Sequence, residues 1–239
     1  DPPAQVSRND CSFAIPGVPV AEGTNTLTVT LEDVSGNIAT HAVEFTKQSL
    51  SGSGFYGYDG NGNLTNEIVW TSGAAVTNGY SYDMENRLVK ATSNGVTVLE
   101  CWYDGVGRRI AKREILGGVT NAVQYVWEGW SILAVLDETG ALLESYTRGV
   151  GVAYDVGSLV AVRHHSGTHS GSTYYLHHNH RGDVTVVRSG STTIATYSYA
   201  AYGEVADATG SYESRFGFSS KEQDDATGLL YFGFRYYAS

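Results

Sequence analysis

Hydrophobic and polar residues alternate along most of this chain. In the stretch "TLTVTLE", residues 26–32, a polar residue at every second position separates two leucines and a valine. Successive side chains of a β-strand point to opposite faces, so this two-residue period predicts strands and not helices. Similar segments, rich in β-branched and aromatic residues, recur at residues 24–33, 41–46, 86–93, 95–104, 122–129, 132–140, 142–149, 159–165, 172–179, 183–190 and 192–200.

Short runs of glycine, asparagine and aspartate separate the predicted strands. Examples are "DGNGN" at residues 59–63, "SNG" at residues 93–95 and "ETG" at residues 138–140. Glycine and asparagine accept the positive φ angles of tight turns, so each run predicts a hairpin. Only residues 219–228 suggest a short helix or an ordered loop. We therefore predict an all-β fold built from successive antiparallel hairpins.

Three regions of the chain differ in character. Residues 1–46 end in "GTNTLTVTLEDVSGNIATHAVEFT", which resembles the last two strands of bacterial Ig-like domains, but too few residues precede it for the other strands of a sandwich. Residues 47–55 are rich in serine and glycine and form a predicted linker. Residues 56–239 form the predicted main β domain. The open strand edges of an Ig-like remnant predict contact with another chain or self-association.

A loose repeat begins at the start of the main domain. Related segments start at Tyr56, Tyr80 and Cys101, and each contains an aromatic residue, a Tyr-Asp pair and a turn. The aspartate of each pair can cap the backbone of its own turn. The pairs, which we predict to be structural repeat positions, are Tyr58–Asp59, Tyr82–Asp83 and Tyr103–Asp104.

The C-terminal stretch "RFGFSSKEQDDATGLLYFGFRYYAS", residues 215–239, carries the most specific pattern. Together with the Tyr-Asp units and "YYLHHNHRGDVTVV", it resembles the YD-repeat or RHS-repeat family and its RHS-associated core motif, over residues 55–239. The family implies a β-sheet strip that spirals into a shell or barrel, which in bacterial toxins and teneurin-like proteins encloses a C-terminal cargo. The matching core positions are Lys221, Glu222, Asp225, Thr227, Gly228, Leu229, Tyr231, Arg235, Tyr236 and Tyr237.

The function implied by this resemblance is that of a scaffold. We expect a secreted protein, extracellular or on the bacterial cell surface, that binds or encloses a partner polypeptide as a shell, toxin-delivery or adhesion module. No catalytic residue is assigned and no cofactor is certain. A net charge of −10 with only 15 Lys and Arg argues against nucleic acid as a partner. No apolar run approaches the ~20 residues of a membrane-spanning helix.

Six of the seven histidines gather between His164 and His180. A hairpin centred near His169 would pair residues whose numbers sum to about 338. That register places His164, His178 and His180 on one face and His165 and His177 on the other. His164 then lies roughly 13 Å along the strands from His178, so a shared ion needs a bulge or a different register.

An alternative function follows from the same histidines. His178 and His180 are spaced two residues apart, so a strand can present both to Zn, Cu or Fe. A third ligand, His164 or His165, would complete a divalent transition-metal site, and a small metal-dependent enzyme on the YD sheet is the alternative prediction. Against it, His177 and His180 match histidine positions of the family, which favours a structural role.

The two cysteines leave their state open. Cys11 and Cys101 are compatible with either one disulfide or two free thiols, and their spacing gives no metal or redox motif. Cys101 lies on a predicted strand beside Trp102, which favours a thiol packed in the core.

Overall fold

Antiparallel strands make up nearly all regular structure in the computed structural model, which describes residues 5–6, 13–14, 21, 23–47, 55–71, 74–151 and 155–239. The all-β prediction is confirmed. Within the described residues, the helical structure is a single 3₁₀ turn, η1 (Phe218–Ser220), in the segment where the sequence suggested a short helix. No helix in those residues has the length and apolarity needed to cross a membrane. The chain divides into two units, which are described in turn.

The N-terminal unit contains a regular two-stranded ribbon. Strands β3 (Gly23–Glu32) and β4 (Ile38–Lys47) pair in unbroken antiparallel register. The Asp33 carboxylate closes their turn by accepting two backbone N–H groups at 2.8 and 2.9 Å. A second short pair is formed by β1 (Gln5–Val6) and β2 (Phe13–Ala14). Residues 48–54 of the predicted linker and most residues before Gly23 lie outside the described residues. The Ig-like remnant therefore stays a prediction.

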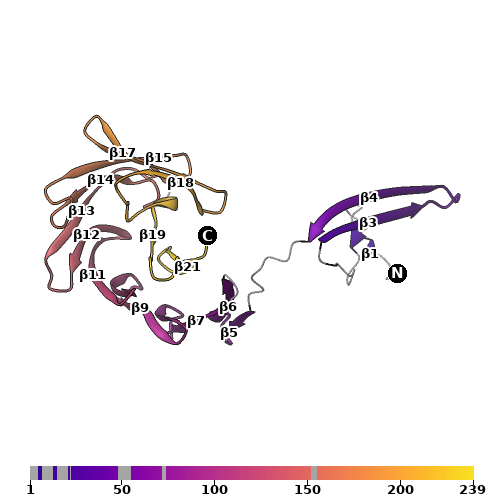
Figure 1. Ribbon diagram of the computed structural model, residues 1–239, viewed down its shortest axis with the longest axis horizontal. Helices are drawn as coiled ribbons and strands as arrows, with labels where there is room; N and C mark the ends of the chain where they lie inside the picture. The colour runs from indigo at the N-terminus through magenta and orange to yellow at the C-terminus, as the bar shows by residue number, and fades with distance from the viewer. Residues whose placement is uncertain are drawn as a thin grey trace. The chain divides into compact units, whose positions relative to one another are not determined.

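The main unit contains a sheet of fourteen strands whose spatial order equals their order in the sequence. Each strand is therefore paired with its chain neighbours through local hairpins, as the alternating segments and turn residues predicted. The sheet curves strongly from β7 to β18 (Figure 1). The strands are β5 (Phe55–Tyr58), β6 (Leu64–Thr71), β7 (Ala74–Tyr82), β8 (Leu88–Ser93), β9 (Val96–Tyr103), β10 (Arg109–Leu116), β11 (Val119–Glu128), β12 (Ser131–Asp137), β13 (Leu142–Arg148), β14 (Leu159–His164), β15 (Thr173–His178), β16 (Val184–Ser189), β17 (Thr192–Tyr199) and β18 (Val205–Gly210).

Aspartate organises the turns that join many of these strands. At Asp59, Asp83, Asp104 and Asp137, one carboxylate oxygen accepts the backbone N–H groups two and four residues later, at 2.8–3.0 Å. The residue three positions after each aspartate is a glycine or asparagine with φ between 61° and 89°, a conformation that other residues adopt only with strain. The Asp-x-x-Gly or Asp-x-x-Asn pattern therefore gives the same turn each time, both in the three Tyr-Asp pairs and at Asp137, which follows a leucine.

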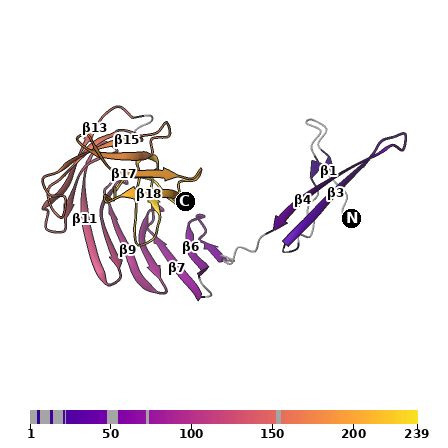
Figure 2. The ribbon, with the colours of Figure 1, turned by 45° about the horizontal axis from the view of Figure 1, so that its top comes forward.

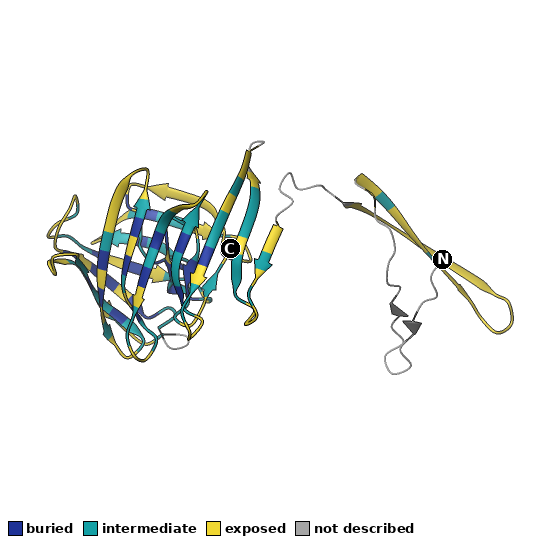
Figure 3. Cartoon of the chain, turned by 90° about the horizontal axis from the view of Figure 1, so that it is seen from below, coloured by how far each residue is buried: buried dark blue, intermediate teal, exposed yellow. Residues whose placement is uncertain are grey.

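The strand direction rotates along the sheet, so that β17 and β18 run across the direction of β9 and β11 (Figure 2). This is the accumulated right-handed twist expected of a long sheet. Burial alternates along the strands (Figure 3), because only the inner face of the curved sheet is covered. Leu99, Val123 and Val135 on that face are at most 2% exposed.

The C-terminal segment lies inside the curve of the sheet (Figure 1). It forms a small three-stranded sheet from β19 (Glu222–Gln223), β20 (Leu230–Tyr231) and β21 (Tyr236–Tyr237). The sequence had predicted a coiling sheet or barrel ending in this core motif. The structure gives the sheet form, with β5 and β18 at its two ends.

Candidate functional site

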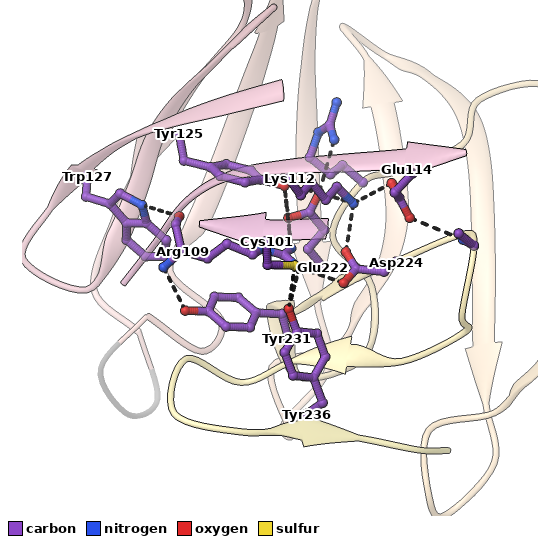
Figure 4. Close-up of polar contacts among 12 residues, drawn as sticks. Cys101, Arg109, Lys112, Glu114, Tyr125, Trp127, Glu222, Asp224, Tyr231 and Tyr236 are labelled. Carbon is purple, nitrogen blue, oxygen red and sulfur yellow. Dashed lines mark hydrogen bonds and ion pairs between the residues drawn. The ribbon is translucent and has the colours of Figure 1, made fainter. Parts of the chain in front are cut away.

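A group of buried charged side chains joins the sheet to the C-terminal segment. Glu222 and Asp224 extend from that segment, and Arg109 and Lys112 extend from β10 (Figure 4). All four are at most 3% exposed. The Arg109 guanidinium donates to an Asp224 oxygen at 2.6 Å and to a Glu222 oxygen at 2.9 Å. The Lys112 ammonium lies 2.8 Å from Asp224 and 3.1 Å from Glu222.

A local irregularity of β10 lets both cations face inward. Residues 109 and 112 are three apart, so a regular strand would point them to opposite faces. The pairing of β10 with β9 shifts between Arg109 and Ala111, and an extra residue of this kind re-aims the side chains that follow it. Lys112 and Glu114 then continue the inward alternation, while Arg113 faces outward and is 46% exposed.

Three further side chains extend the cluster along the inner face. Glu114 accepts from Lys112 at 2.7 Å and from the Ala226 backbone N–H at 3.2 Å. Arg215 donates to Glu144 on β13 at 2.7 Å and to Glu222 at 3.1 Å. We call the seven residues the buried ionic network, which contains three cations and four carboxylates: Arg109, Lys112, Glu114, Glu144, Arg215, Glu222 and Asp224.

Tyrosines surround Arg109 within the network. Its guanidinium carbon lies 4.4 Å from the ring centroid of Tyr231, and its backbone N–H donates to the Tyr231 hydroxyl at 2.9 Å. A guanidinium N–H also donates to the Tyr236 hydroxyl at 2.9 Å. Tyr125 in turn donates to Glu222 at 2.7 Å. The core-motif tyrosines therefore bind the sheet's arginine by both ring face and hydroxyl.

Neighbouring charges in the network hold Glu222 and Arg109 in their ionised forms. Burial alone would raise the pKa of Glu222, but the charges of Lys112, Arg109 and Arg215 lower it far below its usual range. Burial would lower the pKa of Arg109, yet Asp224 and other neighbours raise it well above its usual value. A general acid or base needs a pKa near the working pH. The arrangement therefore suits an electrostatic anchor better than a proton-transfer centre.

The histidines named as metal ligands occupy three different environments. His164 on β14 is buried, its Nε2 lies 3.1 Å from the Tyr212 hydroxyl, and its Nδ1 lies 3.7 Å from Glu144. His178 on β15 is half-buried, and its Nε2 has no hydrogen-bond partner among the described residues. His180 lies exposed in the following turn. The described residues contain no group of three His, Cys, Asp or Glu side chains placed to hold one ion, so metal binding stays a prediction.

The register expected for this hairpin was wrong by two. In the structure Val162 pairs with Tyr174 and Arg163 with Thr173, so paired numbers sum to 336 and not 338. The connecting loop fixes this register, because His164 N–H donates to Ser172 O and Gly171 N–H donates back to His164 O. A shift by two keeps every side chain on its expected face.

The remaining residues named from the sequence lie close to the network or in the turns. Cys101 is buried, with its sulfur 3.3 Å from the Tyr236 hydroxyl, and Cys11 lies outside the described residues, so a disulfide between them is untested. Arg235 and Gly228 lie in connections of the small C-terminal sheet, where Gly228 has φ +72°. Tyr237 donates to the Tyr202 carbonyl at 2.7 Å.

Sequence reasoning missed most of the buried ionic network. Glu222 was named only as a motif position, and the other six members were not candidates. A signal was present in "RRIAKRE", residues 108–114, where five of seven residues are charged and a strand would carry charges on both of its faces. Because one face of a curved sheet is covered, charges on both faces of a strand place some of them on the covered face, where they need partners of opposite charge.

Comparisons with known proteins agree with this architecture. A sequence profile described as the teneurin YD-shell matches residues 27–239. The chain is 33% identical over 214 residues to the tRNA3(Ser)-specific nuclease WapA of Bacillus spizizenii, covering 86% of this chain and 8% of that protein. It is 27% identical over 236 residues to the double-stranded DNA deaminase toxin A of Burkholderia cenocepacia, covering 86% of this chain and 16% of that one.

The fold also matches solved structures. The crystal structure of TcdB2-TccC3 without its hypervariable C-terminal region aligns with a TM-score of 0.51 and 17% identity, over 90% of this chain and 13% of that one. The complex TcdB2-TccC3-Cdc42 gives the same score and identity. This likeness shows a shared fold. The chain spans only a small part of each of these proteins.

Proposed function

The chain belongs to the teneurin YD-shell family, and we propose that it forms a section of shell wall that binds or encloses a partner polypeptide. The buried ionic network carries this proposal. It joins residues more than a hundred positions apart in the chain, Arg109 with Glu222 and Asp224. The result is a curved wall with the C-terminal segment locked inside it, and such a wall offers an inner surface to another chain.

The relatives support a place in a toxin-related protein that acts outside the cell that makes it. Nuclease and deaminase activities give two of them their names, but this chain spans 8% and 16% of those proteins. We assign this chain the scaffold role and no catalytic role, because neighbouring cations lower the pKa values of the carboxylates Glu144 and Glu222 in the buried ionic network.

The two ends of the sheet add a second means of contact. Every residue of β18 is exposed, and strands at a sheet edge have unpaired backbone groups that accept another strand. β5 lies at the opposite end and exposes Phe55, Tyr56 and Tyr58. Both edges favour a polypeptide partner over a small solute.

Binding of an unfolded polypeptide tests the proposal. We expect fluorescein-labelled α-lactalbumin, reduced and carboxymethylated so that it cannot fold, to bind the chain saturably in fluorescence anisotropy. The same protein with intact disulfides is the matched control and should not bind. No binding of the unfolded form, or equal binding of both forms, would contradict a surface made for polypeptide in extended form.

A further inference from the structure

A cavity of about 480 Å³ opens beside the buried ionic network. Its walls come from the β11–β12 hairpin, the C-terminal segment and the connection between β13 and β14. Most lining side chains are aromatic or aliphatic, and we call the cavity the tryptophan pocket after its two indoles; its principal lining residues are Trp127, Trp130, Ile132, Phe216, Tyr231 and Phe234. A volume of this size lies in the range of pockets that hold small ligands or single side chains, ~300–1,000 Å³.

The walls of the pocket are fixed in place. The Trp127 indole N–H donates to the Arg109 carbonyl at 3.0 Å, which ties one wall to β10. Ile132, Phe216 and Tyr231 are at most 5% exposed, so they cannot move aside without opening the core. A preformed apolar pocket loses little entropy when it is filled, which favours binding.

One wall of the pocket contains an aromatic pair contributed by two segments of the chain. Phe234 of the C-terminal segment packs on Trp130 with ring centroids 4.5 Å apart and an interplanar angle of 48°. Phe234 is nevertheless 71% exposed, so part of its ring surface faces outward. Offset and tilted aromatic pairs are favourable because ring edges meet ring faces. A further ring entering the pocket would find the same geometry.

The polar groups of the pocket do not select a charged ligand. The Lys221 ammonium and an Asp155 carboxylate oxygen form an ion pair at 2.7 Å in the wall. Glu222 also reaches the lining, but its charge is bound by the cations of the network. The ion pair retains donor and acceptor capacity for an amide next to a ring. A peptide-borne aromatic side chain therefore fits both the walls and the rim.

We propose that the tryptophan pocket binds an aromatic side chain, tryptophan or phenylalanine, of the polypeptide held against the inner face of the sheet. This inference rests on the proposed function and adds the kind of side chain that is recognised. The pocket forms an anchor point, where a buried ring fixes an otherwise extended chain.

Selective ¹⁵N labelling of tryptophan indoles gives a direct test. We expect Ac-Gly-Trp-Gly-NH₂ to shift the indole signals of Trp127 and Trp130 and to leave Trp102, 47% exposed on β9, unchanged. Ac-Gly-Leu-Gly-NH₂ should bind about three- to tenfold more weakly, the factor that an aromatic pair contributes. Trp130→Ala and the surface variant Phe234→Ala should each weaken the tryptophan peptide by a similar factor, whereas Trp102→Ala should not.

Each other outcome has a definite meaning. Absence of shifts at Trp127 and Trp130, or equal binding of the two peptides, overturns the inference. Binding of free indole without binding of the tryptophan peptide overturns the polypeptide as the source of the ring. If the tryptophan peptide does not bind while unfolded α-lactalbumin still binds, only the assignment of the pocket is rejected. If unfolded α-lactalbumin does not bind while the tryptophan peptide shifts the Trp130 signal, the proposed function is rejected and the aromatic specificity of the pocket stands.

Discussion

Replacement of Arg109 by methionine should destabilise the protein strongly. Arg109 is fully buried and contacts Asp224 at 2.6 Å and Glu222 at 2.9 Å. The change leaves two cations among four carboxylates in the buried ionic network. Removing one partner of a buried ion pair costs about 3–5 kcal/mol, because the opposite charge stays buried without compensation. We expect this loss in the free energy of unfolding, measured by urea titration with tryptophan fluorescence.

A matched control lies four positions along the same strand. Arg113 pairs with Glu100 on the outer face and is 46% exposed, so Arg113→Met should cost less than about 1 kcal/mol. Hydrogen exchange should place the damage from Arg109→Met first in residues 222–237, because a long sheet of hairpins can open in parts. Equal costs for the two methionine variants, or no local loss of protection in that segment, would refute the anchor.

Four other expectations test separate parts of the structure. Burial lowers the pKa of His164 below its usual 6.5, so the unfolded chain takes up the proton first and the free energy of unfolding falls as the pH drops below 6.5. His164→Phe should flatten this pH dependence in urea titrations, and an unchanged pH dependence would count against it. Asp104→Ala removes two backbone hydrogen bonds and an ion pair from its turn and should cost about 1–2 kcal/mol by thermal unfolding. Gly210→Ala would place a methyl group 2.1 Å from a backbone oxygen at φ +97° and should lower the free energy of unfolding by about 3 kcal/mol or more. Gly140→Ala, where the methyl group meets open space, should lower it by about 1–2 kcal/mol, and equal losses would disprove the clash. The metal site predicted from the sequence requires close to one ion per chain in tag-free protein, lost in His178→Ala, and elemental analysis far below that ratio rejects it.

The order and pairing of the strands follow from local patterns in the sequence. Alternation predicts most of the strands, although not β5, β6, β7, β10 or β18, and Asp-x-x-Gly or Asp-x-x-Asn turns close four of the hairpins. Glycine-rich or asparagine-rich turns close most of the others, so neighbours in the sequence become neighbours in the sheet. The β14–β15 register was missed by two because the loop between His164 and Ser172 closes through backbone hydrogen bonds. Backbone hydrogen bonds of this kind form with many residue types, so the sequence pattern does not predict them.

The buried ionic network was not predictable in the same way. Arg109 and Lys112 occur in a strand with several charges, and on sequence alone such charges are assigned to a solvated face. Their burial depends on a bulge in β10 and on a segment more than a hundred residues away folding back across them. The aromatic core motif indicated that this segment is structured, but nothing local indicated which strand it meets.

The use of charges at this junction has a physical reason. The inner face presents similar apolar residues on several strands, such as Leu99 on β9, Val123 on β11 and Val135 on β12. An apolar C-terminal segment would therefore find nearly equal contacts against more than one of them. Glu222 and Asp224 remove that ambiguity. In a shifted position their carboxylates would be buried away from Arg109 and Lys112, at a cost of several kcal/mol for each ion. The repeated hairpins thus supply a uniform wall, and the ionic contacts select the one position on it where the segment can dock.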